Sequence, residues 1–319
     1  MKNRLISILA LSLALTLAAC ASTPPPPVTP ARVAALKGTT AMGMLKMISG
    51  EPERFNFSIH GTADEIVAGL QGGTLDIAAV PSNLASVLYN RTEGGVRVIA
   101  VNTRGVLYVL DTTDAVHTIE DLRGCTVYST GMGTTPEFAL NYILRQNGLE
   151  PGADVTIEYK TESTELGALM AMGMAELCVL PEPYATTVLD RNEASRVALS
   201  LSDEWDAVQP EFGMLSGSVV VRTAFLEENP DVVEAFLSDY RVSVDYINAN
   251  AAEGGRLAAQ YEIAPADVAQ AAIPRCNIIC MTGAEMQRNL SGYLGVLFEA
   301  DPKSVGGSLP DAAFYYRPE

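Results

Sequence analysis

The sequence contains little histidine and little positive charge. Its 319 residues include 2 histidines, and 21 lysines and arginines stand against 38 acidic residues, a formal net charge of −17. A nucleic-acid-binding protein needs a basic surface, so this charge excludes nucleic acid as a partner. Because His60 and His117 are the only histidines, the sequence offers no zinc-type cluster and leaves general acid–base chemistry to carboxylates or tyrosines.

The short motifs of common enzyme classes are also missing. The sequence has no GxxxxGK[ST], GxGxxG, GxSxG or HExxH pattern, and no cysteine and histidine stand in a context that suggests a catalytic pair. We therefore expect no enzymatic activity, no bound cofactor and no metal site.

Long apolar runs are absent beyond the N-terminus, where one short run follows Lys2 and Arg4. The run Leu5–Leu17 has the charged start and apolar core of an export signal, which predicts a signal peptide at residues 1–19. The following "LAAC" resembles the lipobox of bacterial lipoproteins, in which the cysteine is acylated; the alternative is a chance Cys20 in an ordinary signal peptide. Residues 20–31 are rich in proline, serine and threonine and predict an extended tether. We expect an extracytoplasmic protein anchored to the cell membrane through acylated Cys20.

Four further cysteines follow. Cys125 and Cys178 lie in apolar, strand-like runs and are expected to be small buried hydrophobic residues. Cys276 and Cys280 are close enough in sequence to pair, and export would permit a disulfide, but the spacing leaves their redox state open.

From Arg32 onward, short apolar strands alternate with helical patterns. This alternation predicts βαβ units and an α/β fold with mostly parallel sheets and flanking helices. The strands are apolar on successive residues, which indicates sheets covered on both faces.

Two stretches one hundred residues apart share a pattern of helix, glycine, acid, buried strand, proline and helix. They are "LDIAAVPSNLASVLYN" at 75–90 and "AELCVLPEPYATTVLD" at 175–190. Two lobes of one plan would produce this repeat. We predict lobe 1 at residues 32–106 plus 217–319 and lobe 2 at residues 107–216, with crossings near "GVLYVL" and "GMLSGSVVV".

Ligands of open parallel sheets bind beyond the carboxyl ends of the strands, where strands turn into helices. Four such junctions are predicted to meet in a cleft, namely Lys37–Gly43, Pro81–Asn83, Ser129–Glu137 and Pro181–Tyr184. In the third junction Gly131 and Gly133 permit tight turns, and Thr135 is a candidate N-cap before Pro136. Free N–H groups at such a helix start suit a polar, oxygen-bearing ligand, although an ordinary capped turn has the same pattern.

Three aromatic residues and one acid are further candidates. Tyr108, Tyr184 and Trp205 could each stack on a flat ligand or simply pack, and the Glu182 carboxylate could accept a ligand N–H or merely favour its helix dipole.

Several stretches together resemble the periplasmic solute-binding proteins of ABC importers, with the type II periplasmic-binding-protein fold. These stretches are the two repeats, "IEDLRGCTVYSTGMGTTPEFALNYILRQNGLEP" and "AFLEENPDVVEAFL". The closest resemblance is to the group of nitrate, taurine, alkanesulfonate and thiamine-pyrimidine (NMT1/THI5-like) binders. It implies two lobes that close on a small-molecule ligand, two hinge crossings, and delivery to an ABC permease in the membrane by a monomer.

By position, the resemblance places ligand contacts at Thr39, Thr40, Ser82, Asn83, Thr130, Gly131, Met132, Thr134 and Glu182; Tyr108 and Tyr184 are added as aromatic candidates. The junctions carry few arginines, so we expect a small polar organic molecule rather than a strongly anionic one. Two rival functions stay open: an enzyme on the same fold, similar to pyrimidine-precursor synthases or chorismate dehydratases, and a lipoprotein that acts as a sensor or in adhesion.

Overall fold

The computed structural model describes residues 30–50 and 53–317. The described residues from Ala31 onward form one compact unit. The predicted signal peptide, Cys20 and most of the tether therefore lie outside the described residues, and their predictions stay untested. Among the described residues, no helix combines the length and apolar character of a membrane span.

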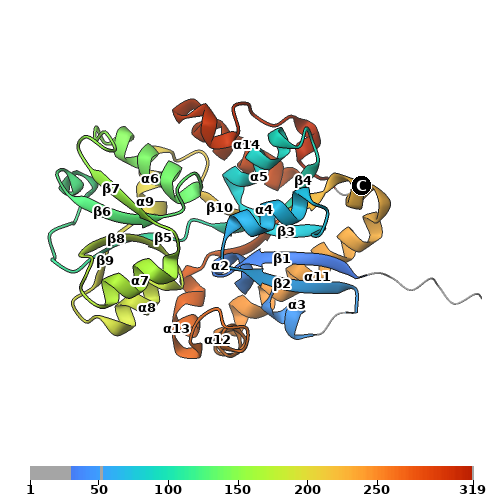
Figure 1. Ribbon diagram of the computed structural model, residues 1–319, viewed down its shortest axis with the longest axis horizontal. Helices are drawn as coiled ribbons and strands as arrows, with labels where there is room; N and C mark the ends of the chain where they lie inside the picture. The colour runs from blue at the N-terminus through green and yellow to red at the C-terminus, as the bar shows by residue number, and fades with distance from the viewer. Residues whose placement is uncertain (1–29, 51–52, 318–319) are drawn as a thin grey trace, which may run out of the picture. The chain divides into compact units, whose positions relative to one another are not determined.

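Two mixed β-sheets organise residues 31–317 (Figure 1). The first has six strands in the order β11-β4-β10-β3-β1-β2. Their bounds are β1 Ala31–Leu36, β2 Phe55–His60, β3 Ile77–Pro81, β4 Val96–Arg104, β10 Leu215–Arg222 and β11 Ile278–Met281. The second has five strands in the order β7-β6-β8-β5-β9. Their bounds are β5 Leu107–Asp111, β6 Thr126–Thr130, β7 Thr156–Lys160, β8 Leu177–Pro181 and β9 Arg196–Ser200.

Helices flank both sheets, which confirms the predicted two-lobed α/β class. Around the first sheet lie α2 Thr39–Met42, α3 Leu45–Ser49, α4 Ala63–Gln71, α5 Ser82–Arg91, α10 Thr223–Glu228, α11 Pro230–Ala249, α12 Ala251–Gln260, α13 Ala266–Ala272 and α14 Gly283–Ala300. Around the second lie α6 Thr135–Gln146, α7 Ser163–Ala171, α8 Tyr184–Arg191 and α9 Leu201–Val208. Short 3₁₀ turns are η2 Ile119–Leu122, η3 Ile273–Arg275, η4 Pro302–Val305 and η5 Ala312–Phe314.

Most antiparallel pairs involve a strand that enters from the opposite sheet; the exception is β11, which pairs antiparallel with β4. In the first sheet β1 pairs in parallel with β2 and β3, and in the second β6 pairs in parallel with β7 and β8. The crossing strands β10 and β5 enter from the opposite sheet, and both pair antiparallel with their neighbours. The parallel strands of each sheet thus all end at the same edge.

Each face of the first sheet packs on its own apolar core. Ala78 of β3 belongs to a core with Leu88 of α5 and Leu290 of α14, whereas its neighbour Ile77 belongs to a core with Phe236 of α11. Figure 1 shows α5 and α14 on one side of the sheet and α11 and α12 on the other. Coverage of both faces explains why successive strand residues are apolar.

The sequence repeat is also a repeat of structure. Helix α4 begins at Ala63 and α7 at Ser163, and strands β3 and β8 run over 77–81 and 177–181. In both copies the glycine after the helix has positive φ, 68° at Gly73 and 71° at Gly173. Glycine adopts this conformation without a Cβ clash, so the same local chemistry ends both helices.

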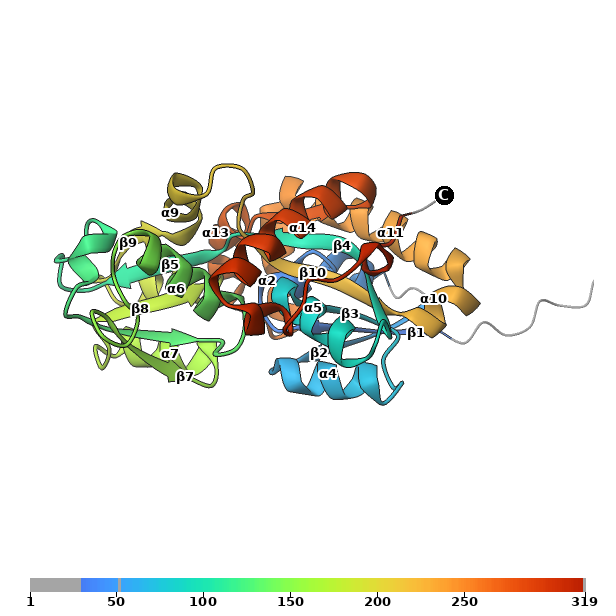
Figure 2. The ribbon, with the colours of Figure 1, turned by 90° about the horizontal axis from the view of Figure 1, so that it is seen from above.

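The segment after α14 lies along α5 (Figure 2). Asn90 of α5 donates to the carbonyls of Val305 and Ser308, and the Tyr89 hydroxyl donates to Asp311 at 2.6 Å. The Gly-rich and aromatic C-terminal stretch therefore packs against the first lobe rather than lining a site.

All four cysteines of the described chain are free thiols. Cys178 is buried, as expected, but Cys125 is half-buried and precedes β6 instead of lying within it. Cys276 and Cys280 do not pair; the Cys276 sulfur lies buried 3.5 Å from the sulfur of Met42.

Gly105 sits at the outward crossing between β4 and β5, where a side chain has no room. A Cβ there would collide with the Ser202 hydroxyl and lie 2.6 Å from the Met214 methyl group. We expect Gly105→Ala to lower the free energy of unfolding by about 1–3 kcal/mol through overpacking. Gly213→Ala is the matched control near the return crossing, because its Cβ would meet only Asp206 at 3.8 Å. Equal urea midpoints for the two variants would contradict the prediction.

Candidate functional site

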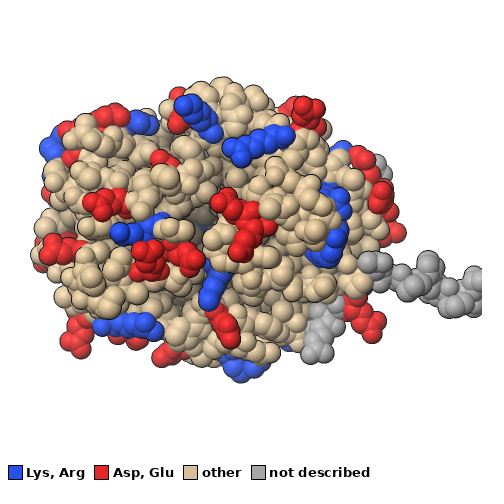
Figure 3. Space-filling model, viewed as in Figure 1, with Lys and Arg blue, Asp and Glu red and all other residues tan. Residues whose placement is uncertain are grey.

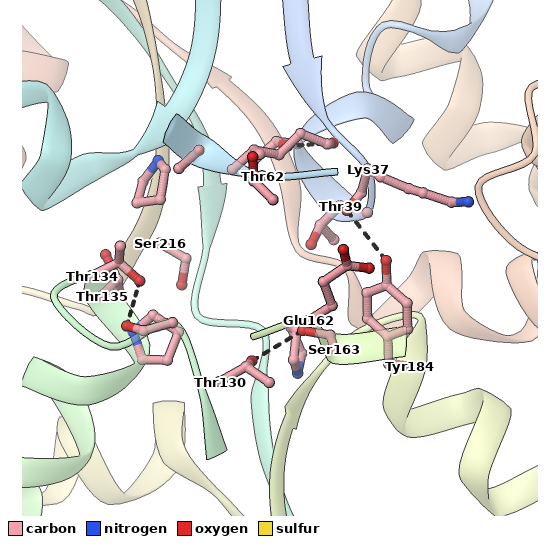
Figure 4. A pocket seen from close by; sticks show the side chains of 18 of the residues that line it. Lys37, Thr39, Thr62, Thr130, Thr134, Thr135, Glu162, Ser163, Tyr184 and Ser216 are labelled. Carbon is pink, nitrogen blue, oxygen red and sulfur yellow. Dashed lines mark hydrogen bonds between the residues drawn. The ribbon is translucent and has the colours of Figure 1, made fainter. Parts of the chain in front are cut away.

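A cleft of about 530 Å³ lies where the carboxyl ends of the parallel strands of both sheets meet. Its walls come from the turns after β1, β2 and β3 on one side and after β6, β7 and β8 on the other (Figure 4). Because parallel strands of one sheet all end at one edge, each lobe presents several helix starts to the same space.

Six strand-to-helix junctions line the cleft, two more than predicted. The additional ones are Gly61–Asp64 after β2 and Lys160–Thr164 after β7. Both strands and both following helices are recognisable in the sequence. The sequence pattern thus predicts both turns, and the parallel order of the strands would have placed them at the same sheet edge as the other four.

Eight predicted residues line the cleft, namely Thr39, Thr40, Thr130, Gly131, Met132, Thr134, Glu182 and Tyr184. Three predicted residues, Ser82, Asn83 and Tyr108, are not among its lining residues.

The turn before α6 depends on glycine. Gly131 and Gly133 have φ of 75° and 77°, and a Cβ on Gly131 would lie 2.6 Å from the Thr134 hydroxyl. The Thr134 hydroxyl donates to the Gly131 carbonyl at 2.7 Å. Thr134 is the N-cap, so the predicted cap at Thr135 was one residue late; Thr135 is already helical.

Met132 lies at the tip of this turn with 70% of its surface exposed. It is the most exposed large apolar side chain among the described residues. It therefore adds an exposed apolar side chain to the lining of the cleft.

The Glu182 carboxylate is buried and already has partners within the protein. Its side chain is fully buried, accepts from Arg275 Nε at 2.7 Å, and accepts from the Thr186 hydroxyl at 2.7 Å. The predicted free carboxylate at a strand end is thus paired with a cation from the first lobe. Arg275 lies 93 residues further along the chain, so no local pattern marks this partner.

Asn83 joins three segments. Its amide donates to the carbonyls of Gly133 and Ser304, at 3.3 and 3.0 Å, and its side-chain oxygen accepts from the Thr135 hydroxyl. The neighbouring Ser82 hydroxyl lies 2.9 Å from that of Ser218 on β10. Both predicted residues are buried and do not line the cleft; Asn83 links α5 to the turn before α6, whereas Ser82, which follows β3, contacts a strand of the same sheet.

The three aromatic candidates differ. The Tyr184 hydroxyl donates to the Lys37 carbonyl, and the ring lines the cleft. The Tyr108 hydroxyl donates to the Arg275 carbonyl at 3.3 Å, and burial together with the Glu182 charge raises its pKa to about 12.

The proposal that Trp205 stacks on a ligand is wrong. Its side chain is fully buried, its ring lies 4.7 Å from Tyr142 and 5.3 Å from Tyr293, and its N–H donates to the Phe212 carbonyl. Trp205 is therefore a packing residue, as the alternative interpretation expected, because the segment that reaches Phe212 buries its indole.

Hydrogen bonds cross the cleft between the two sheets. Thr39, after β1, donates to the Glu182 carbonyl at the end of β8, and Tyr184 donates to Lys37 (Figure 4). The Glu182–Arg275 pair adds a further link between the two lobes, in which Glu182 lines the cleft and Arg275 does not.

The described residues contain no group of three or more histidine, cysteine, aspartate or glutamate side chains placed to hold a metal ion. Neither histidine nor cysteine is among the described residues that line the cleft. The arrangement offers many hydroxyls and backbone groups, which bind and orient a solute.

Comparisons with known proteins agree with this geometry. The model of the NMT1-like family matches residues 60–261, well over half of the chain. A search of curated proteins found no match.

Several solved structures share the fold. An ABC transporter protein from Parabacteroides distasonis has a TM-score of 0.75 and 24% identity, covering 91% of this chain and 99% of that chain. The periplasmic aliphatic sulphonate binding protein of Escherichia coli has a TM-score of 0.71 and 16% identity, covering 91% and 92%. The periplasmic nitrate-binding protein of Synechocystis PCC 6803 has a TM-score of 0.63 and 15% identity, covering 87% and 84%.

Proposed function

Because this chain belongs to the NMT1-like family, we propose that it is the solute-binding component of an ABC importer. The observation that carries the proposal is the cleft of about 530 Å³ between two α/β lobes, built at the strand ends of both. That volume suits a small organic molecule. The similarity to binding proteins named for sulphonate and nitrate supports the same role.

Capture would proceed by hinge closure. We place lobe 1 at residues 32–106 plus 217–319 and lobe 2 at residues 107–216, so that the chain crosses between them after β4 and before β10. A solute would bind one wall first, and the helix starts of the other wall would complete its hydrogen bonds. The contacts of Thr39, Tyr184 and Asn83 across the cleft are those expected of the closed form.

The proposal includes the setting of the protein. We infer an extracytoplasmic monomer anchored through acylated Cys20, which passes its solute to a permease in the membrane. A flexible tether at residues 20–31 would let the lobes reach that permease.

Binding without chemical conversion is part of the proposal. The described cleft residues bring hydroxyls, two lysines and three acids, but no histidine or cysteine. If the protein were an enzyme, a bound molecule would change mass on incubation, and this outcome would favour the rival function.

Native mass spectrometry of the full chain in mild detergent tests the function. We expect a discrete co-purified mass that is lost after denaturation and refolding. Adding the released fraction back should raise the melting temperature, since a ligand at 100 times its Kd adds about 2.7 kcal/mol of stability. Bovine serum albumin carried through the same extraction is the control fraction. Absence of a bound mass and of any thermal response would contradict the function.

A further inference from the structure

Two hydroxyls on the cleft walls are buried without a hydrogen-bond partner among the described residues. They are Tyr159 Oη, on β7 of the second sheet, and Ser216 Oγ, on β10 of the first. Both residues line the cleft, and Figure 4 shows Ser216 between the Thr134–Thr135 turn and the Lys37–Tyr184 hydrogen bond. A buried polar group left unpaired destabilises the protein unless something else completes its bond.

Most other hydroxyls of the cleft are already engaged within the protein, and the two that are not, those of Thr62 and Thr161, are not buried. Thr39 donates to Glu182, Thr134 donates to Gly131, and the Thr130 hydroxyl lies 3.0 Å from that of Ser163. Tyr159 and Ser216 therefore stand out, because hydrogen bonding by the surrounding protein does not use them.

The protonation state of Tyr159 is fixed by its surroundings. Burial, with a smaller contribution from the Glu137 charge, raises the pKa of its hydroxyl well above the ordinary value of 10. The hydroxyl stays protonated at neutral pH and can donate or accept a hydrogen bond, as the serine can.

The formal charges around the cleft balance. Lys37 and Lys160 line it together with Asp64, Glu162 and Glu182, and Glu182 is neutralised by Arg275. Figure 3 shows acidic and basic side chains next to one another around the hollow between the lobes. The cleft therefore has no net excess of cationic side chains, which removes one of the two common ways of binding an oxoanion; the other is a free helix start.

Three of the six helix starts at the cleft, those of α4, α6 and α7, carry an acid of their own, whereas α2, α5 and α8 have none in the first turn. Asp64 and Glu65 lie in the first turn of α4, and Glu165 lies in the first turn of α7. In α6 the Glu137 carboxylate accepts the Gly133 N–H. These carboxylates occupy the positions where an anionic ligand would gain from the helix dipole.

We propose that Tyr159 and Ser216 are specificity-determining residues that hydrogen-bond one uncharged polar solute across the cleft, and that the site selects such solutes over oxoanions. This inference rests on the proposed function. It names hydroxyls from opposite walls, so the bound solute would bridge the two lobes and favour closure.

Thermal shifts with two sets of probes test the selectivity on the full chain in detergent. The uncharged probes are thymine, cytosine, uridine and myo-inositol, and the oxoanions are sulfate, nitrate, phosphate and methanesulfonate. We expect at least one uncharged probe, or a neutral co-purified molecule, to raise the melting temperature, and none of the oxoanions to do so. A response to an oxoanion alone would overturn the selectivity but keep the solute-binding function. Silence across both sets, with no co-purified mass, would contradict the function itself.

Tyr159→Phe and Ser216→Ala test the two hydroxyls. Each should weaken binding of the responding uncharged molecule about tenfold, the effect of one lost hydrogen bond. Each should leave the melting temperature of the unliganded protein unchanged or higher, because an unpaired buried hydroxyl is removed. Unchanged affinity in both variants would overturn the role of the hydroxyls.

Matched controls carry the same chemical changes outside the cleft. Tyr240→Phe and Ser195→Ala remove buried hydroxyls from residues that do not line it. We expect both controls to bind within twofold of the unmodified protein. A loss of affinity in the controls equal to that in the cleft variants would mean that the effect is not local, and would also overturn the proposal.

Discussion

Replacing Arg275 by methionine is expected to open the cleft of the unliganded protein and to lower its melting temperature. Arg275 donates to Glu182, whose side chain is fully buried; Arg275 precedes β11 of the first sheet and Glu182 follows β8 of the second, so the pair joins the two lobes. Without the arginine, the carboxylate keeps only the Thr186 backbone N–H and hydroxyl. Because an uncompensated buried charge is costly, separation of the walls, which lets water reach Glu182, becomes the favourable response.

The expected loss is about 3 kcal/mol, at the lower end for a broken buried pair because 39% of the Arg275 side chain is exposed. Small-angle X-ray scattering should show a larger radius of gyration for Arg275→Met. The double variant Glu182→Gln/Arg275→Met should recover much of the stability, since it carries no buried charge. Arg123→Met is the control, because its pairs with Glu120 and Asp154 lie at the solvent-exposed surface, where ion pairs contribute little to stability. Unchanged scattering and melting temperature in Arg275→Met would disprove this role.

Asp76→Asn is expected to destabilise the first lobe by about 3 kcal/mol, roughly 6–12 °C in melting temperature. The Asp76 side chain is 4% exposed and accepts from Arg32 at 2.6 and 2.8 Å and from Arg222 at 2.7 Å. These arginines lie on β1 and β10, the strands on either side of β3, so one carboxylate ties three neighbouring strands together. Asparagine has the same shape but leaves both cations without their counter-charge.

The sequence repeat supplies the matched control for Asp76. Glu176 occupies the corresponding place in the second lobe but is exposed, so Glu176→Gln should change stability by less than about 0.5 kcal/mol. Equal losses of stability in Asp76→Asn and Glu176→Gln would contradict this prediction, because the effect could then not come from the pairing of Asp76 with Arg32 and Arg222.

The Asp76 network also predicts a dependence on pH. Burial by itself raises the pKa of Asp76, but hydrogen bonds from Arg32 and Arg222 outweigh it and leave the pKa below its ordinary value. A lowered folded pKa contributes stability that is complete above the unfolded value of about 4 and is lost as the pH falls through the folded pKa. Urea midpoints of the unmodified protein should therefore fall below pH ~4, and those of Asp76→Asn should fall less steeply. Asp111, whose pKa is lowered by backbone N–H groups against the effect of its burial, keeps part of the slope in both proteins.

The sequence by itself determined the features that depend on local chemistry. Periodicity and glycine positions predicted the alternating strands and helices, and the pattern repeated at 75–90 and 175–190 predicted two similar units, whose elements coincide at an offset of one hundred residues. Eight of the predicted contacts, including Thr39, Gly131 and Tyr184, line the cleft because strand ends and helix starts are encoded within a few residues.

Only the tertiary structure decided which polar groups are free and which are already paired. Glu182 reads in the sequence as an open carboxylate, but folding brings Arg275 to it from 93 residues away, and Asn83 is taken by Gly133 and Ser304. Conversely, Tyr159 and Ser216 carry no local signal, and they become distinctive because the folded chain buries them beside the cleft without a partner. The hydrogen-bond partners of a buried side chain depend on long-range packing, whereas secondary structure depends on neighbours in sequence. The fold could therefore be predicted from the sequence, but the free polar groups of the site could not.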